Sequence, residues 1–221
     1  MSIPFQNRSE AGQLLAGKLI DYKNRSDALV LALPRGGVPV GLEVALVLEA
    51  PLDVFLVRKL GVPGHEELAF GAIATGGVRV LLQDIVHSYR ISQGDIEAVA
   101  GREHTELERR ERLYRGGLPA SDPAGRTVIL VDDGLATGAT MLAAVRALRK
   151  ENPKQIIVGV PVASIEACDD FRPEVDKIVC AATPDPFYAV GFWYRDFTQT
   201  TDEEVHRLLE QADAATRGVR S

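Results

Sequence analysis

The stretch that decides the fold is Val128-Ile-Leu-Val-Asp-Asp-Gly-Leu-Ala-Thr-Gly-Ala-Thr140. Its first four residues are apolar and predict a short strand that is buried in a sheet. Two adjacent acids, Asp132 and Asp133, follow directly, and a loop with two glycines leads into a helix predicted at 137–150. Ligands of open α/β sheets bind at the carboxyl ends of the strands, so this order of elements predicts a binding site at the acids and the loop.

The loop after the acids has the composition of a phosphate site. Gly134 and Gly138 allow backbone N–H groups to approach an anion closely, and the helix N-terminus adds unpaired donors and a partial positive charge. The hydroxyls of Thr137 and Thr140 can donate as well. The acids suit sugar hydroxyls, so the pattern favours a ligand that has both a sugar and a phosphate.

Three alternatives compete with this interpretation. A strand followed by Asp-Asp-Gly also occurs as a plain turn or a helix cap. The nucleoside-triphosphate loop is disfavoured because no lysine follows a glycine here, and the dinucleotide fingerprint is disfavoured because its glycine spacing is different. The full order of apolar strand, two acids, small-residue loop and helix supports the sugar-phosphate hypothesis over a plain turn.

Other short apolar runs predict further buried strands, and helices are expected between them. Alternating strands and helices favour a mostly parallel sheet that is covered on both faces. A glycine-rich stretch at 61–77 contains part of a predicted β-hairpin, and 93–115 is so rich in charge that it predicts a solvated helix. The strands are expected at 28–33, 53–57, 127–131, 155–160 and 177–182, the hairpin at 70–75 and 78–82, and the remaining helices at 8–22, 40–48, 164–171 and 202–212.

Composition narrows the class of protein. The 221 residues suit one α/β domain, and the formal net charge of -6 disfavours an extended nucleic-acid surface. The two cysteines, Cys168 and Cys180, match no metal or redox spacing and are expected to be reduced thiols. Without a leader-like segment or an apolar run of membrane-spanning length, we expect a cytoplasmic protein that binds neither membrane nor nucleic acid.

Val128 to Thr140 closely resembles the phosphoribosylpyrophosphate motif of type I phosphoribosyltransferases, and the resemblance extends over about 28–182. The whole chain resembles bacterial predicted phosphoribosyltransferases whose acceptor is unassigned, and the run from Val57 to His65 supports this resemblance. The resemblance implies an α/β fold with a Rossmann-like parallel five-stranded sheet flanked by helices, a β-hairpin flap and a small C-terminal hood. A single domain, 1–221, would then have a core at about 28–182 and a hood at about 183–221 that includes the N-terminal helix.

The family resemblance assigns roles to residues of the motif and of two other loops. Asp132 and Asp133 would meet the ribose hydroxyls and are candidate ligands of Mg²⁺, directly or through water. The loop would hold the 5-phosphate with Gly134, Ala136, Thr137, Gly138, Ala139 and Thr140. Pyrophosphate would lie at the ends of the first two predicted strands, against Arg35, Gly36, Gly37, Arg58 and Lys59. A Gly-Gly turn and a pair of surface charges are the plain alternatives for these two segments.

The implied reaction uses 5-phosphoribosyl-1-pyrophosphate (PRPP) and Mg²⁺ and transfers phosphoribose to a nitrogenous base or a related nucleophile. The candidate catalytic residues are Asp132, Asp133, Arg35 and Lys59. The segment 83–118 is the candidate flap, and its candidate contributors are Arg102, His104, Arg109 and Arg110. A closing flap would keep water away from the activated sugar.

The acceptor is left open, with two candidate segments, Gly64-His65-Glu66-Glu67 and the aromatic stretch 183–197. The aromatic side chains there suit stacking on a planar base, and core packing or a dimer surface is the alternative. Two other functions stay open: a regulatory protein that senses PRPP and binds RNA, and a hydrolase or phosphorylase of ribose-phosphate compounds. A homodimer is also left open.

Overall fold

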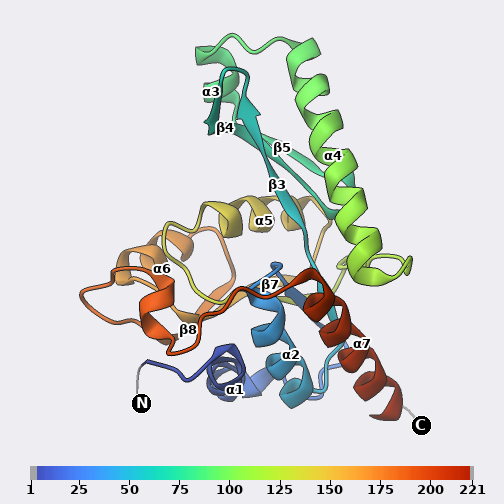
Figure 1. Cartoon of the computed structure of the whole chain (residues 1–221), viewed down its shortest axis with the longest axis vertical. Helices are drawn as coiled ribbons and strands as arrows, with labels where there is room; N and C mark the ends of the chain where they lie inside the picture. Colours follow the sequence, from blue (N-terminus) through green and yellow to red (C-terminus); the bar gives the residue numbers. More distant parts are fainter. Residues whose placement is uncertain (1–3, 220–221) are drawn as a thin grey trace.

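The computed structural model describes residues 4–219 and contains the expected parallel five-stranded sheet (Figure 1). The strand order is β2-β1-β6-β7-β8, and every neighbouring pair is parallel. The strands are β1 (Ala28–Ala32), β2 (Leu52–Val54), β6 (Thr127–Val131), β7 (Gln155–Val162) and β8 (Lys177–Ala182). The chain adds β2 on one side of β1 and β6 on the other, so the connections diverge between β1 and β6. This is the switch point at which open α/β sheets bind ligands.

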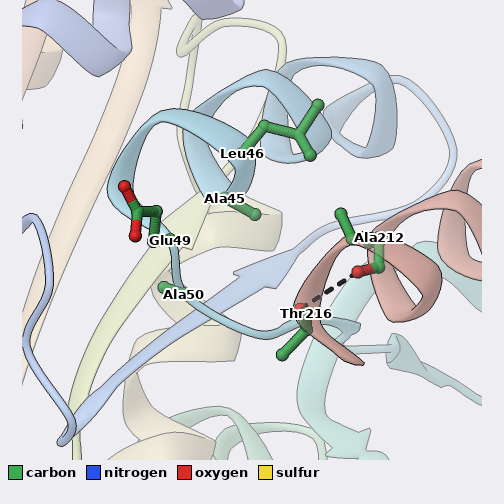
Figure 2. A pocket seen from close by; sticks show the side chains of 7 residues that line it. Ala45, Leu46, Glu49, Ala50, Ala212 and Thr216 are labelled. Atoms are coloured by element: carbon green, nitrogen blue, oxygen red, sulfur yellow. Dashed lines mark hydrogen bonds between the residues drawn. The ribbon is translucent and has the colours of Figure 1, made fainter. Parts of the chain in front are cut away.

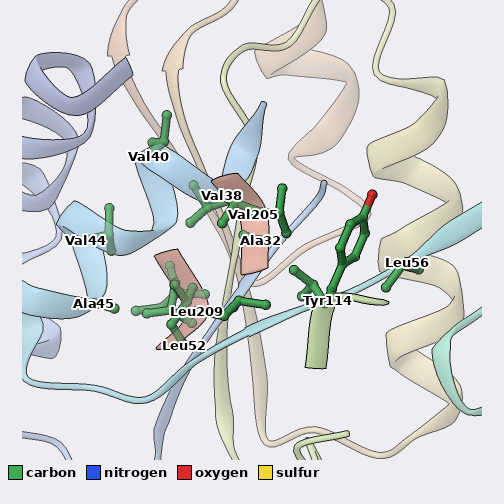
Figure 3. Packing of buried hydrophobic residues seen from close by; sticks show 14 of the residues in the cluster. Ala32, Val38, Val40, Val44, Ala45, Leu52, Leu56, Tyr114, Val205 and Leu209 are labelled. Atoms are coloured by element: carbon green, nitrogen blue, oxygen red, sulfur yellow. The ribbon is translucent and has the colours of Figure 1, made fainter. Parts of the chain in front are cut away.

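Helices cover both faces of this sheet, as predicted (Figure 1). Successive residues of a strand point to opposite faces, so Val30 packs in one apolar core and Leu31 in the other. The first face is covered by α1 (Arg8–Lys18), α2 (Gly37–Leu48) and α7 (Asp202–Val219), and the second by α5 (Ala139–Lys150) and α6 (Ile165–Phe171). Figure 3 shows Val38 of α2 and Leu209 of α7 packing in the first core, where Tyr114 also lies.

A second sheet rises beside the first and is antiparallel, with the order β3-β4-β5 (Figure 1). Its strands are β3 (Val57–Val62), β4 (His65–Ala74) and β5 (Arg79–Leu81), with η2 (Thr75–Gly77) between the last two and α3 (Gln83–Ser88) after them. The hairpin prediction located the β4–β5 pair but began too late, at residue 70, and β3 was missed. Leu60 of β3 is buried, yet its neighbours are basic residues and a glycine, which hid the strand from a hydrophobicity pattern.

The predicted second strand at 53–57 was too long. The parallel strand β2 ends at Val54, and the apolar run then continues into the antiparallel sheet. Leu56 already pairs there, because its N–H donates to Thr75 Oγ1 at 2.9 Å and its carbonyl accepts from the Thr75 N–H at 2.9 Å. Arg58 and Lys59 therefore lie inside β3 and not at the end of a parallel strand. A continuous apolar run does not show where a chain leaves one sheet for another.

The charged helix α4 (Gln93–Arg115) has the predicted bounds, and Ser92 and Asp95 form a capping box at its start. It is less solvated than predicted, because Ile96, Val99 and Leu107 are buried in the first core. Other bounds differ slightly: α1 stops at Lys18 and is followed by η1 (Ile20–Tyr22), α5 begins at Ala139, and α7 continues to Val219. Among residues 4–219, no helix is both long and apolar enough to cross a membrane.

Candidate functional site

Asp132 and Asp133 lie directly after β6 at the switch point of the sheet. Asp132 Oδ1 accepts a hydrogen bond from the N–H of Asp133 at 2.8 Å. Asp133 Oδ2 accepts one from Nε of Arg8 at 2.8 Å, and the two side chains are only 11% and 16% exposed for Arg8 and Asp133. Burial raises the pKa of both acids. The charge of Asp133 raises the pKa of Asp132 further, whereas Arg8 opposes the rise in the pKa of Asp133.

The loop Pro34-Arg35-Gly36-Gly37 packs against these two acids. A Cβ atom added at Gly36 would lie 2.1 Å from Asp133 Oδ2, and one at Gly37 would lie 2.8 Å from the carbonyl oxygen of Val131. A residue with a Cβ atom would overlap its neighbours at either position, so both positions require glycine. The structure therefore brings the predicted pyrophosphate loop and the predicted acid pair together, although about one hundred residues of sequence separate them.

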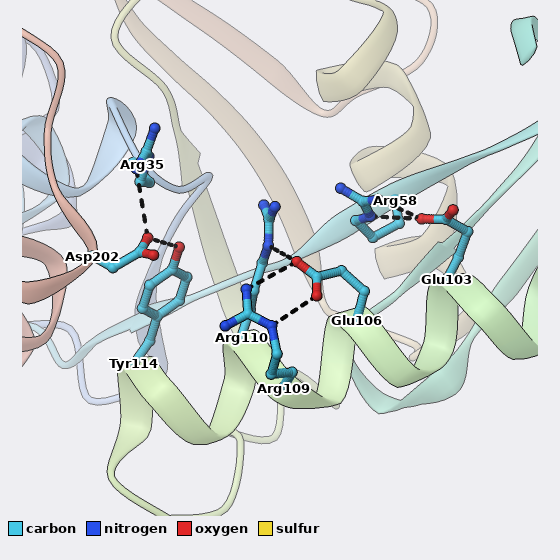
Figure 4. A network of polar contacts seen from close by, with 8 residues as sticks. All are labelled: Arg35, Arg58, Glu103, Glu106, Arg109, Arg110, Tyr114 and Asp202. Carbon is cyan, nitrogen blue, oxygen red and sulfur yellow. Dashed lines mark hydrogen bonds and ion pairs between the residues drawn. The ribbon is translucent and has the colours of Figure 1, made fainter.

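Arg35 lies at the start of a row of polar side chains shown in Figure 4. Its Nη1 atom is 3.7 Å from Oδ1 of Asp202, the first residue of α7. The same Asp202 oxygen accepts a hydrogen bond from the Tyr114 hydroxyl at 2.7 Å. Burial and this hydrogen bond raise the pKa of Tyr114 to about 12, so the hydroxyl stays protonated at neutral pH.

The loop after the acids has the geometry of an anion site. Gly138 has a φ of 69°, which favours glycine, and α5 begins at Ala139 without a side-chain cap. The backbone N–H groups of the first helical turn lack partners within a helix, and Ala136, Thr137 and Thr140 are exposed around them. An anion can therefore approach the loop from solvent. Thr137 precedes the helix, whereas the sequence predicted that the helix would begin there.

Arg58 and Lys59 are neighbours on β3, so their side chains point to opposite faces of the antiparallel sheet. Arg58 faces α4, where its Nε donates to Glu103 Oε2 at 2.7 Å (Figure 4). Lys59 lines a cavity of about 280 Å³ on the other face, together with Ala139 and Leu142 of α5. The sequence treated the two residues as one basic pair, but this geometry separates them.

Three of the four candidate flap residues contact other side chains of the same helix, α4. Arg109 and Arg110 both donate to Glu106, with Nε to oxygen distances of 2.8 and 2.7 Å (Figure 4). These two hydrogen bonds lower the pKa of Glu106 to about 2. His104 Nδ1 lies 3.6 Å from Oε1 of Glu108, and Arg102 is exposed.

The aromatic segment 183–197, which follows β8, folds over the loop 134–140 that is predicted to bind phosphate. It helps to line a cavity of about 460 Å³ beside Thr137, whose wall includes Ser164, Glu166 and residues 184–188. The rings of Phe187 and Trp193 are stacked with centroids 6.4 Å apart. The other candidate segment, 64–67, lies at the tip of the antiparallel sheet, at the top of Figure 1.

Comparison with known proteins identifies the family. The sequence profile of the phosphoribosyl transferase domain matches residues 6–179. The chain belongs to the phosphoribosyl transferase domain family. It is 45% identical over 208 residues to the protein Rv0571c of Mycobacterium tuberculosis, which carries the provisional name phosphoribosyl transferase. That match covers 94% of this chain and 47% of the relative, so the chain spans about half the length of the curated relatives that it matches.

A solved structure extends the comparison to the fold. The crystal structure of TT1426 from Thermus thermophilus is 42% identical to this phosphoribosyl transferase domain, with a TM-score of 0.84. The match covers 95% of this chain and 99% of that one. The overall arrangement of this chain is thus similar to one that has been determined experimentally.

Three candidate site residues of this phosphoribosyl transferase domain were missed by the sequence analysis: Arg8, Tyr114 and Asp202. Tyr194 lies in the aromatic stretch that was predicted to stack on a base, but its contact with the acid pair was not predicted. Tyr194 donates its hydroxyl hydrogen bond to the carbonyl oxygen of Asp133 at 2.5 Å, and Arg8 reaches its partner across 125 residues of sequence. No local pattern marks such contacts, because each depends on where two distant segments meet.

A smaller cavity of about 60 Å³ lies between the ends of α2 and α7 (Figure 2). Its wall is mostly alanine and leucine, with Glu49 and Thr216 as the polar residues. Because α2 ends where β2 is about to begin, this cavity lies toward the amino ends of the strands. It is therefore separate from the site at the acid pair.

Proposed function

We propose that this domain binds PRPP at the switch point and transfers its phosphoribosyl group to a nitrogen nucleophile, with release of pyrophosphate. The observation that carries the proposal is the meeting of three parts at one sheet edge: the acid pair, the open helix N-terminus of α5, and the Arg35-Gly36-Gly37 loop. Asp132 and Asp133 would accept hydrogen bonds from the ribose hydroxyls. The loop from Gly134 to Thr140 would hold the 5-phosphate.

Departure of pyrophosphate leaves positive charge on the ribose and places negative charge on the leaving group. Arg35 is suited to the leaving group, because its guanidinium can donate two parallel hydrogen bonds to phosphate oxygens. Its Nη1 atom lies 3.7 Å from Oδ1 of Asp202, a distance that leaves the guanidinium available to a stronger anion. Three other cations are candidates for binding the leaving group together with Arg35. Arg58 and Arg110 lie on the α4 side, and Lys59 lies on the α5 side.

Mg²⁺ fits this proposal as an ion whose ligands would come partly from the protein and partly from the substrate. No cluster of three or more acid, histidine or cysteine side chains suited to a metal occurs within residues 4–219. Two carboxylates are present at the site, and one oxygen of Asp133 is already bonded to Arg8. Mg²⁺ commonly takes one or two carboxylates, several waters and substrate phosphates. Asp132 and Asp133 would hold it directly or through water, and it would neutralise charge on the pyrophosphate.

The acceptor would enter the cavity beside Thr137 under the segment 184–188. Phe187 and Tyr188 offer ring faces for stacking, while Glu166 and Asp185 offer carboxylates that accept hydrogen bonds from ring or amino N–H groups. We therefore propose a planar nitrogenous base as the acceptor. The segment 183–221 with the N-terminal helix would then act as the hood of this single domain.

The test is to incubate the protein with PRPP, Mg²⁺ and a panel of purine and pyrimidine bases, and to measure pyrophosphate release. We expect release with at least one base, and loss of release in the double variant Asp132→Asn, Asp133→Asn. Binding of ribose 5-phosphate to both proteins should be measured by calorimetry. Absence of release with every base, or unchanged ribose 5-phosphate affinity in the double variant, would contradict the proposal.

A further inference from the structure

Arg8 is the first residue of α1, and its side chain contacts three groups from distant parts of the sequence. Its Nε donates to Asp133 Oδ2 at 2.8 Å, and its Nη1 donates to the carbonyl oxygen of Thr198 at 2.7 Å. The guanidinium carbon lies 4.0 Å from the centre of the Phe197 ring, within the range of a cation–π interaction. Arg8 is thus held on one side by the hood segment while it binds the acid on the other.

The backbone around Arg8 is fixed from two directions. Asn7 caps α1, because its side chain accepts from the N–H of Glu10 at 3.0 Å. The helix crosses α2 closely at Gly12, where an added Cβ would lie 2.9 Å from the Val40 carbonyl oxygen. Just before α1, the residue Phe5 pairs with the hood in a short parallel bridge to Tyr194. These contacts place the guanidinium at the acid pair with little freedom.

The acid itself is confined by the same contacts. Asp133 Oδ2 lies between Arg8 and the backbone of Gly36, while the Asp133 carbonyl oxygen accepts from the Tyr194 hydroxyl at 2.5 Å. The side-chain hydrogen bond that Asp133 accepts from Arg8 is made to Oδ2 and not to the other carboxylate oxygen, Oδ1. Arg8 and Gly36 therefore fix the position of one carboxylate oxygen, and this sets the direction of the other.

We propose that Arg8 is a positioning residue of the donor site: it holds Oδ2 of Asp133 and thereby orients Oδ1 of the same carboxylate toward the sugar. The inference rests on the proposed function, because it assumes that Asp133 binds a ribose hydroxyl. It adds that the N-terminal helix belongs to the sugar-binding site, and that recognition of the hydroxyls depends on Arg8 whereas recognition of the phosphate does not. The phosphate loop makes no contact with Arg8 among the hydrogen bonds and ion pairs of the described residues.

The test compares two ligands by calorimetry or NMR titration: ribose 5-phosphate, and ethyl phosphate, which has a phosphate but no sugar hydroxyls. We expect Arg8→Gln to weaken ribose 5-phosphate binding by about 10- to 100-fold, the range for a lost hydrogen bond to a charged group. Ethyl phosphate binding should stay within about twofold, and Arg8→Lys should give an intermediate loss because it keeps the charge. If Arg8→Gln does not fold, Arg8→Lys provides the same comparison.

Arg25→Gln is the matched control, because Arg25 also binds an aspartate, Asp27, with an Nε to Oδ1 distance of 2.9 Å, but lies before β1 at the opposite sheet edge. It should leave both affinities unchanged. Equal losses for both ligands in Arg8→Gln, or unchanged ribose 5-phosphate affinity, would overturn the inference. If the wild-type protein prefers ribose 5-phosphate in an Arg8-dependent way but transfers no phosphoribose, only the proposed reaction fails. If it shows no preference for ribose 5-phosphate over ethyl phosphate, the inference and the sugar site fall together.

Discussion

The substitution Gly138→Ala tests the geometry of the loop 134–140, which is predicted to bind phosphate. Gly138 has a φ of 69°, and a Cβ atom there would lie 2.4 Å from Cε2 and 3.0 Å from Cζ of the Phe171 ring on α6. A left-handed conformation costs a residue with a Cβ about 1–2 kcal/mol. An inserted methyl group in a packed region costs about 1–3 kcal/mol more. We therefore expect Gly138→Ala to lower the free energy of unfolding by about 2–5 kcal/mol, a large part of the about 5–15 kcal/mol of a typical domain.

Urea unfolding followed by circular dichroism measures this effect, and a double-mutant cycle separates its two causes. In a Phe171→Leu background the ring overlap is gone, so Gly138→Ala should cost only the backbone part, about 1–2 kcal/mol. Gly101→Ala is the control, because Gly101 is exposed in α4 and a Cβ there meets nothing within 4 Å. It should stabilise the protein by about 0.5–1 kcal/mol. A cost for Gly138→Ala below about 0.5 kcal/mol, the range of an ordinary surface substitution, would refute the loop geometry. An equal cost in both backgrounds would refute the Phe171 contact.

Three other measurements test the site and its surroundings. The pKa of Asp132 is raised in the folded protein, so its contribution to stability is present below the ordinary aspartate pKa and is lost as pH rises through the folded value. Asp132→Asn in metal-free buffer should therefore raise the melting temperature at pH 7, by an amount that shrinks toward pH 4. A difference in melting temperature that does not depend on pH would contradict this. Asp53 and Arg115 form an ion pair of 2.8 Å, and their side chains are only 9% and 5% exposed. Asp53→Ala should therefore lower the free energy of unfolding, measured by urea titration, by about 3–5 kcal/mol. A change below about 1 kcal/mol would show that the pair is solvated. Because Arg58 and Lys59 face opposite sides of β3, only one of the variants Arg58→Ala and Lys59→Ala should weaken pyrophosphate binding by about tenfold or more in calorimetry, and equal losses would argue against that geometry.

The sequence by itself determined the elements that carry local patterns. The apolar run at 127–131, the acids after it and the glycines of the loop predicted strand β6 and its site, because burial on both faces leaves a continuous apolar signal. The charged helix at 93–115 was predicted with its correct bounds from its run of charged residues, and the structure adds the capping box at Ser92 and the left-handed C-cap at Gly116. The same local information failed at 52–62, where one apolar run passes from a parallel sheet into an antiparallel one.

Only the tertiary structure decided which distant residues share the site. The strand order β2-β1-β6 brings the Arg35-Gly36-Gly37 loop onto Asp133. The spacing of residues along the sequence does not show which strands are neighbours in a sheet. The pleat of β3 separates Arg58 from Lys59, although they are adjacent in sequence. Arg8 meets Asp133 where α1 packs across α2 and Phe5 pairs with Tyr194, so this contact depends on segments that are far apart in the sequence.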